Sequence, residues 1–188
     1  VALGQGGEPA WPFQAGDAVL SVCVAGQVAD DHPLVAAGAN DRRLYLLEEG
    51  GEVRWSHRFE IFRGGWAWYT RNSSVELVKS ADLRGVGKPD ILAAVTDRQL
   101  HCFDADGNER WTFFIYGIFD PFCLADVNGD GRLEVIGGPG RISCGGTCYV
   151  LDADGREIAS DGLDGWPSMI PGCDVYMHEN GDNLIACG

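Results

Sequence analysis

The feature that most constrains the fold of this chain is an internal repeat. Each copy has an apolar run, a polar turn, a second apolar run, and then a glycine-containing turn that leads into a more polar strand. Three copies cover residues 34–55, 90–111 and 134–157, and a fourth begins within 172–188. When 62–74 is treated as an insertion, the repeat length is about 45 residues, which is in the range of propeller blades.

Each repeat contains four short β-strands by its pattern. Apolar runs alternate with turns rich in glycine and aspartate, and no stretch has the periodicity of a long helix. Glycine accounts for 27 of the 188 residues, about twice its usual share of roughly 7%. Four-stranded units repeated around an axis form a β-propeller, whereas a β-sandwich, the main alternative, does not repeat a motif at this spacing.

We therefore predict an all-β protein built from four-stranded antiparallel blades, with about three and a half blades in this chain. A separate N-terminal segment covers 1–16, and the insertion covers 62–74. The predicted blades are 17–61, 75–116, 120–160 and, in part, 170–188. An incomplete ring leaves open sheet edges. Either residues 1–14 help to complete a small ring, or this arc belongs to a larger propeller, which is what we expect. A missing region or a partner would then bury the open blade edges.

Two segments resemble known propeller repeats. Residues 125–134, followed by the apolar run 135–138, resemble the FG-GAP/VCBS repeat. Residues 98–111 are similar to the PQQ-like repeat, and this resemblance implies that Trp111 docks between blades. Together the resemblances cover roughly residues 17–188 and imply the propeller fold. The same repeats occur in adhesins, lectin-like modules, scaffolds and enzymes, so function has to be argued from the residues.

The loop 126–134 carries the clearest chemistry. Oxygen-bearing side chains occupy its first, third, fifth and ninth positions, and glycine at the sixth allows a sharp bend. Calcium prefers about six to eight oxygen ligands, so we predict a calcium site in this loop. The ligands would be the side chains of Asp126, Asn128, Asp130 and Glu134 and the backbone carbonyl of Arg132. The FG-GAP/VCBS pattern has Asp in the ninth position, where this chain has Glu134; the alternative is an Asx-rich turn without metal.

The corresponding loop of the second repeat, 82–90, lacks the oxygen ligands of the third and fifth positions. Arg84 could place its guanidinium near Asp82 and Asp90, so that a salt bridge replaces the ion. A single complete loop among altered copies indicates a structural ion. The Asp-Ala-Asp-Gly segments 104–107 and 152–155 are interpreted as hairpin turns rather than as carboxylate pairs with a chemical role.

The aromatic insertion is the best candidate for ligand binding. Trp66, Trp68 and Tyr69 could present a flat apolar face to a sugar ring or to an apolar partner. The alternative is that these rings pack between blades. No catalytic residues are predicted, because none of the 4 histidines has the neighbours of a known catalytic motif.

Charge and cysteine content narrow the partners and the compartment. Lys and Arg number 14 against 28 Asp and Glu, which gives a net charge of −14 and argues against nucleic acid. No apolar run approaches the roughly 18 residues of a membrane span, so we expect no membrane insertion. The 7 cysteines and the calcium-type loop favour an oxidising, extracellular or periplasmic location. Cys144 and Cys148 could close a small local loop.

These observations favour a secreted, non-catalytic, calcium-stabilised propeller module that binds a protein or a glycan or acts as an assembly scaffold. The alternative is the propeller part of a carbohydrate-active enzyme of the rhamnogalacturonan-lyase type. A quinoprotein is less favoured, because the adjacent cysteine pair that stacks on its cofactor does not occur in this sequence.

Overall fold

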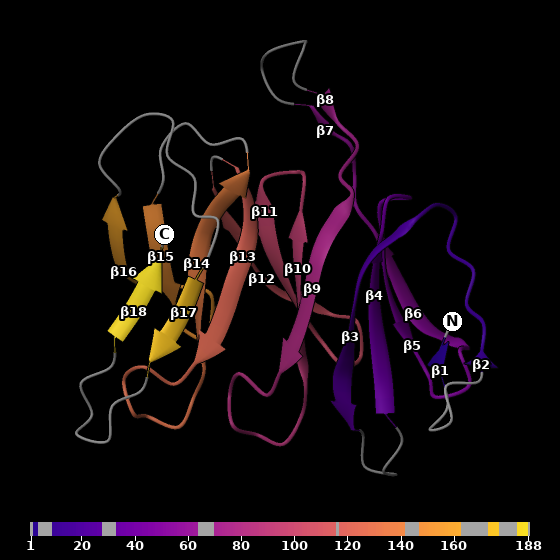
Figure 1. The fold of residues 1–188 in the computed structure, drawn as a ribbon, viewed down its shortest axis with the longest axis horizontal. Helices are drawn as coiled ribbons and strands as arrows, with labels where there is room; N and C mark the ends of the chain where they lie inside the picture. Colours follow the sequence, from indigo (N-terminus) through magenta and orange to yellow (C-terminus); the bar gives the residue numbers. More distant parts are fainter. Residues whose placement is uncertain are drawn as a thin grey trace.

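The computed structural model describes residues 2–3, 9–27, 33–63, 70–115, 117–141, 147–162, 173–176 and 184–187 (Figure 1). The first four-stranded sheet contains β3 (Val19–Gln27), β4 (Pro33–Ala39), β5 (Arg43–Leu47) and β6 (Val53–Arg58). The second contains β9 (Val75–Ala81), β10 (Asp90–Val95), β11 (Gln99–Asp104) and β12 (Glu109–Phe114). The third contains β13 (Ile118–Ala125), β14 (Glu134–Arg141), β15 (Thr147–Leu151) and β16 (Glu157–Gly162).

Three two-stranded hairpins complete the described structure. They are β1 (Ala2–Leu3) with β2 (Pro9–Trp11), β7 (Phe62–Arg63) with β8 (Thr70–Arg71), and β17 (Cys173–Tyr176) with β18 (Leu184–Cys187). All strand pairs are antiparallel, and the described residues contain no helix. Consequently no helix in this part of the chain could cross a membrane. The predicted all-β fold of four-stranded antiparallel blades is confirmed.

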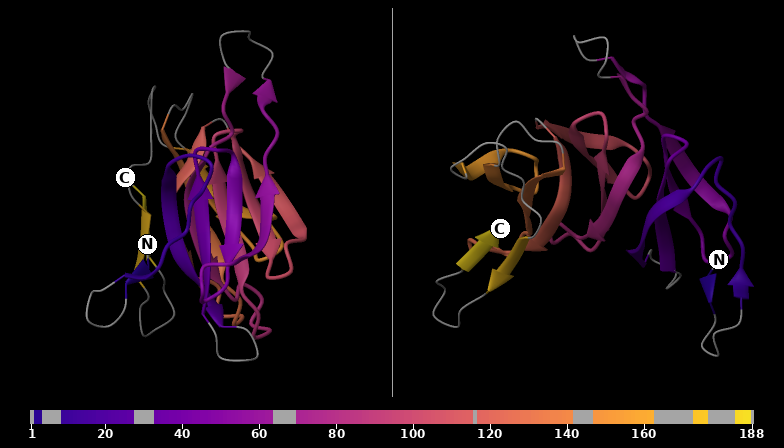
Figure 2. Two further views of the ribbon diagram at one scale, coloured as in Figure 1. Left: turned by 90° about the vertical axis from the view of Figure 1, so that its right-hand side faces the viewer. Right: turned by 45° about the horizontal axis from the view of Figure 1, so that its top comes forward.

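The sheets follow one another along an arc (Figure 2). Within each sheet the strands lie side by side in chain order. The first strand of each sheet contacts the first strand of the next: β3 contacts β9, and β9 contacts β13. The β17–β18 hairpin continues this series, since β17 contacts β13. This is the arrangement of successive propeller blades.

Aspartate-glycine turns close the outer hairpins. In the β11–β12 turn, the Asp104 carboxylate accepts the N–H groups of Asp106 at 3.0 Å and Asn108 at 2.9 Å. Asp152 accepts the N–H groups of Asp154 and Arg156 in the same way, at 2.9 and 2.8 Å. The interpretation of these segments as hairpin turns is confirmed.

The core consists of apolar layers between neighbouring sheets rather than one central cluster. The first sheet packs against the second through residues that include Leu34, Leu46, Val78, Ile91 and Phe103. The second packs against the third through residues that include Leu92, Leu100, Phe122, Val135 and Leu151. A third layer lies on the opposite face of the first sheet and includes Ala37, Tyr45, Leu47, Trp11 and Phe13.

Tryptophans on the outer strands join each sheet to the next. The indole N–H of Trp55 in β6 donates to the carbonyl of Ala105 at 3.0 Å, and that of Trp111 in β12 donates to Ala153 at 3.1 Å. Both carbonyls belong to the outer hairpin turn of the following sheet. The predicted docking of Trp111 between blades is therefore confirmed. We call this contact between a tryptophan and the next turn the tryptophan latch.

Candidate calcium loop and its charged surroundings

The candidate loop connects β13 to β14 and is closed by the carboxylate of Asp126. This carboxylate accepts N–H groups from Gly129 at 2.7 Å, Gly131 at 2.9 Å and Asp130 at 3.2 Å. The hydrogen bonds from Gly131 and Gly129 hold the pKa of Asp126 below its usual value. The loop is thus folded tightly around a carboxylate that stays ionised.

Asn128 links the other two predicted side-chain ligands, Asp130 and Glu134. Its amide nitrogen donates to Asp130 Oδ2 and to Glu134 Oε1, both at 3.2 Å. The second oxygen of Glu134 accepts the N–H of Val127 at 2.9 Å. Asp130 accepts the N–H of Arg132 at 2.8 Å. The structure therefore brings the oxygen-bearing side chains of the first, third, fifth and ninth positions into one connected loop.

Glu134 is the electrostatically unfavourable member of this set. It is only 1% exposed, at the start of β14. Burial raises the pKa of Glu134, and the negative charges of Asp130 and Asp126 raise it further, while the Val127 N–H opposes the rise. A cation between these carboxylates would reduce their mutual repulsion.

The donor set suits calcium in its chemistry, because it offers three carboxylates, an amide oxygen and backbone carbonyls, all hard oxygen ligands. In the arrangement described here, many of these oxygens accept N–H groups within the loop. No group of three or more His, Cys, Asp or Glu within the described ranges is arranged to hold a metal. In this arrangement the amide nitrogen of Asn128 faces Asp130 and Glu134. The calcium site stays a prediction.

The corresponding loop of the second sheet, between β9 and β10, contains a salt bridge instead. Arg84 lies 3.3 Å from the buried carboxylate of Asp90, which confirms that part of the prediction. Asp82 instead accepts the backbone N–H groups of Val86 and Gly87. Arg110 in β12 provides a second cation, 3.1 Å from Asp90. Sequence reasoning missed Arg110, although it occupies the same place before a latch tryptophan as Arg54 does in the first repeat.

Ion pairs connect the two loops. Arg110 also lies 3.3 Å from Asp154, and Arg132 of the candidate loop lies 3.1 Å from the other oxygen of Asp154. The backbone adds a direct link, because the N–H of Leu133 donates to the carbonyl of Leu83 at 2.9 Å. The candidate loop is thus attached to the neighbouring sheet by both charge and backbone.

A buried histidine forms a separate polar cluster that the sequence did not reveal. His101 in β11 lies between Asp97, at 3.0 Å from Nε2, and Glu109, at 2.6 Å from Nδ1. Burial alone would lower the pKa of His101, but the hydrogen bonds and charges of Asp97 and Glu109 raise it. Because both ring nitrogens are engaged, neither is left to act on a substrate. The cluster therefore ties β12 to the turn before β11.

Two further predictions, on the aromatic insertion and on the Cys144–Cys148 pair, involve residues outside the described ranges. Trp66, Trp68 and Tyr69 lie outside the described residues, so their proposed ligand-binding face stays a prediction. Cys148 in β15 is disulfide-bonded, whereas Cys144, its suggested partner, lies outside the described residues. Cys23 and Cys102 are free thiols.

No protein-family model matches the chain, and no curated protein matches it. Solved structures of β-propeller type do match it in fold. A structure of BBS1N in complex with ARL6DN has a TM-score of 0.67 at 12% identity, with 98% of this chain and 53% of that chain covered. BamB from Moraxella catarrhalis gives a TM-score of 0.56 at 17% identity, with 89% and 44% covered. The V. cholerae biofilm matrix protein Bap1 gives 0.60 at 14% identity, with 96% and 31% covered.

These comparisons establish the propeller fold and leave the FG-GAP/VCBS assignment as a resemblance. The chain spans only about a third to a half of the length of these solved structures, since it covers 31% to 53% of each. At such low identities a shared fold carries no information about a shared activity.

Proposed function

We propose that this chain is a non-catalytic β-propeller module of a secreted protein. Calcium bound by the loop 126–134 stabilises it, and its role is to bind another protein or a glycan or to hold an assembly together. The repeat belongs to the FG-GAP/VCBS type. The observation that carries the calcium part is the loop itself, in which Asn128 links Asp130 to the buried Glu134.

Several features support a structural ion. The loop lies at the edge of a sheet, and Leu133 and Arg132 attach it to the neighbouring sheet and turn. An ion here would fix the loop and, through these links, the spacing of the second and third sheets. The second loop supports the same role, because Arg84 lies beside Asp90 where an ion would otherwise balance the acid.

Other observations support the proposed compartment and kind of partner. The disulfide at Cys148 favours an oxidising compartment. One similar structure is a biofilm matrix protein, and another is of a protein in complex with ARL6DN. Both are compatible with a propeller module that works by contact rather than by catalysis.

The calcium site is tested by thermal unfolding with calcium and with a chelator. Wild-type protein should melt at a higher temperature in excess calcium, because a ligand at a hundred times its dissociation constant stabilises by about 2.7 kcal/mol. Asp130→Ala should lower the melting temperature and abolish the calcium-dependent rise. If Asp130→Ala in excess calcium melts at the wild-type temperature, the site is misassigned.

A matched control separates loss of the ion from loss of a turn carboxylate. Asp106 in the β11–β12 turn is also an exposed aspartate beside a glycine. Asp106→Ala should leave the calcium-dependent rise unchanged. The conservative Asp130→Asn keeps an oxygen that can accept the Arg132 N–H, so it should reduce the calcium response with little change in the chelated protein.

A further inference from the structure

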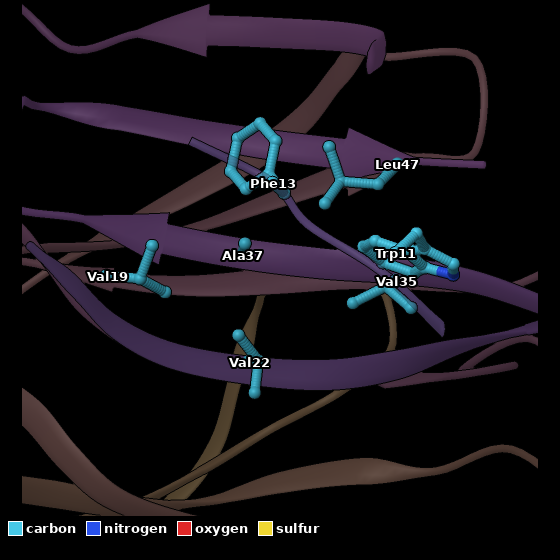
Figure 3. Close-up of a pocket in the computed structure, with 7 residues that line it drawn as sticks. All are labelled: Trp11, Phe13, Val19, Val22, Val35, Ala37 and Leu47. Atoms are coloured by element: carbon cyan, nitrogen blue, oxygen red, sulfur yellow. The ribbon is translucent and has the colours of Figure 1, made fainter. Parts of the chain in front are cut away.

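An apolar groove lies on the face of the first sheet that points away from the second sheet. The cavity has a volume of about 280 Å³. The residues that line it all have apolar side chains: Trp11, Phe13, Val19, Val22, Val35, Ala37 and Leu47 (Figure 3). An exposed apolar face of this kind marks a contact surface.

Strand register identifies what this surface corresponds to in the other sheets. Val22 pairs with Ala37, Val78 pairs with Ala93, and Phe122 pairs with Gly137, each across the first two strands of its sheet. Val78 and Phe122 are 2% and 0% exposed, because the preceding sheet covers them, whereas Val22 is 62% exposed. Val22 therefore occupies an inter-sheet position, and the described residues supply only part of the sheet that would precede it.

The rest of the lining follows the same correspondence. Val35 and Leu47 pair with each other as Ile91 pairs with Phe103 in the second sheet. Ile91 and Phe103 pack in the layer against the first sheet. The groove thus has the composition and the location of an inter-blade layer.

Trp11 shows that part of the missing neighbour is already present. A Cβ atom on Gly107 would lie 3.0 Å from the ring of Trp55, and one on Gly51 would lie 2.7 Å from the ring of Trp11. Gly51 is the turn glycine of the first sheet, so Trp11 occupies the position of a latch tryptophan. The β1–β2 hairpin therefore lies where the third and fourth strands of a preceding blade would lie, which we call its outer pair. The groove is the space for the first and second strands, the inner pair.

The chain also carries an inner pair of strands. The β17–β18 hairpin contacts β13 through β17, as the first strands of successive sheets do. Among the described residues no further strand pairs with it. This inner pair and the β1–β2 outer pair lie at opposite ends of the arc (Figure 2), so the hairpin does not reach the groove of its own chain.

We propose that the groove binds the β17–β18 hairpin of a second copy of this chain. The inner pair of one copy and the outer pair of the other would form one four-stranded blade at each junction. Two copies joined head to tail in this way would close a ring. Each of the two hairpins has two strands, and each complete blade of the chain has four, so the two hairpins together supply the strands of one blade.

The association is tested by sedimentation velocity and light scattering on the 188-residue chain over a wide concentration range. Moderate salt is needed, because each copy carries a net charge of −14. Wild-type protein should be a dimer. Val22→Asp should raise the dissociation constant about a hundredfold or more, because it places an unpaired carboxylate in an apolar layer.

The control substitution is Val86→Asp, in the loop between β9 and β10. Val86 is 56% exposed, close to Val22, but it lies outside the groove. Val86→Asp should leave the dimer intact, and both variants should keep the wild-type circular dichroism spectrum. Val24→Asp, on the same face of β3, provides a second disruption should Val22→Asp fail to fold.

Hydrogen exchange locates the contact. In the dimer, amides of β1, β3 and β18 should gain protection with concentration in wild type and in Val86→Asp, but not in Val22→Asp. Energy transfer between two differently labelled copies should rise in parallel. A chain that stays monomeric at all concentrations, or a dimer that persists in both Val22→Asp and Val24→Asp, would overturn the proposal.

Discussion

Asp90 in β10 lies 3.1 Å from the guanidinium of Arg110 in β12, and its side chain has no exposed surface. Arg84 approaches the same carboxylate oxygen at 3.3 Å. Burial raises the pKa of Asp90, and the charges of Arg110 and Arg84 oppose the rise without cancelling it. The two cations therefore offset part of the cost of burying this carboxylate.

Replacing Arg110 should accordingly be costly. We expect Arg110→Met to lower the free energy of unfolding by about 3–5 kcal/mol, because it leaves a buried carboxylate with one partner fewer. Arg54→Met is the control. Arg54 holds the corresponding position in β6, but Leu34 stands where the second sheet has Asp90. The partner of Arg54 is instead Glu48, whose partly exposed carboxylate lies 3.2 Å from the guanidinium. Urea unfolding should show a loss in the free energy of unfolding of about 1 kcal/mol or less for Arg54→Met. Similar losses for both variants would contradict the prediction.

The tryptophan latch should account for a large part of the stability between the second and third sheets. Trp111→Ala removes a large ring and the hydrogen bond to Ala153, so we expect a loss of about 3–5 kcal/mol. Phe114→Ala is the control on the same strand, where the ring is 50% exposed, and it should cost much less. A loss below about 1 kcal/mol for Trp111→Ala would remove the latch role.

Two glycines allow steric contact to be separated from backbone strain. Gly155 and Gly87 both have φ of +76°. A Cβ atom on Gly155 would meet the ring of Trp111, whereas one on Gly87 would have no neighbouring atom within 4 Å. Gly87→Ala should cost about 1–2 kcal/mol from the left-handed backbone alone. Gly155→Ala should cost about 1–3 kcal/mol more, because the methyl group meets the indole. Equal melting temperatures for the two variants would show that the ring moves aside freely.

The buried His101 should make stability depend on pH. Its pKa is raised in the folded state from 6.5, so its contribution is complete below the unfolded pKa and is lost as pH rises through the folded value. We expect His101→Gln to abolish a fall in the free energy of unfolding as pH increases above about 6.5. Urea unfolding at several pH values measures this slope.

His57 provides a control of opposite sign. Burial lowers the pKa of His57, with Glu109 opposing and His101 reinforcing the shift. The unfolded chain then binds the proton more tightly, so His57 makes stability rise with pH through this range. Relative to wild type, His57→Gln should steepen the fall in the free energy of unfolding with rising pH. His101→Gln should flatten or reverse that fall. Identical pH profiles for the two variants would refute the assignment of the slope to His101.

The repeat pattern was sufficient to predict the sheets because each turn is encoded locally. Asp104 and Asp152 cap their own turns within four residues, and a contact of that range is visible in the sequence. Arg84 and Asp90 belong to one loop, so their pairing could be predicted as well. The loop 126–134 was recognised for the same reason, although its hydrogen bonds could not be read from the residue types.

Contacts between strands and between sheets were missed because they depend on register. Arg110 reaches Asp90 across the sheet, and His101 meets Glu109 on the neighbouring strand. The sequence leaves open whether residues 1–14 help to complete a ring, and the contact of Trp11 with Gly51 likewise depends on how distant segments meet. A tryptophan shortly before the first strand of a repeat was the available signal, because Trp111 precedes β13 in the same way.

The tryptophan latch has a consequence for how such a chain can change its length. Each latch joins one sheet only to the next, and each core layer lies between two successive units. Stability should therefore accumulate junction by junction, as in other linear repeat arrays. Duplication of one whole unit in the gene would need to create a single new junction with a geometry that already exists, which makes the number of units easier to alter than the sequence within any one of them.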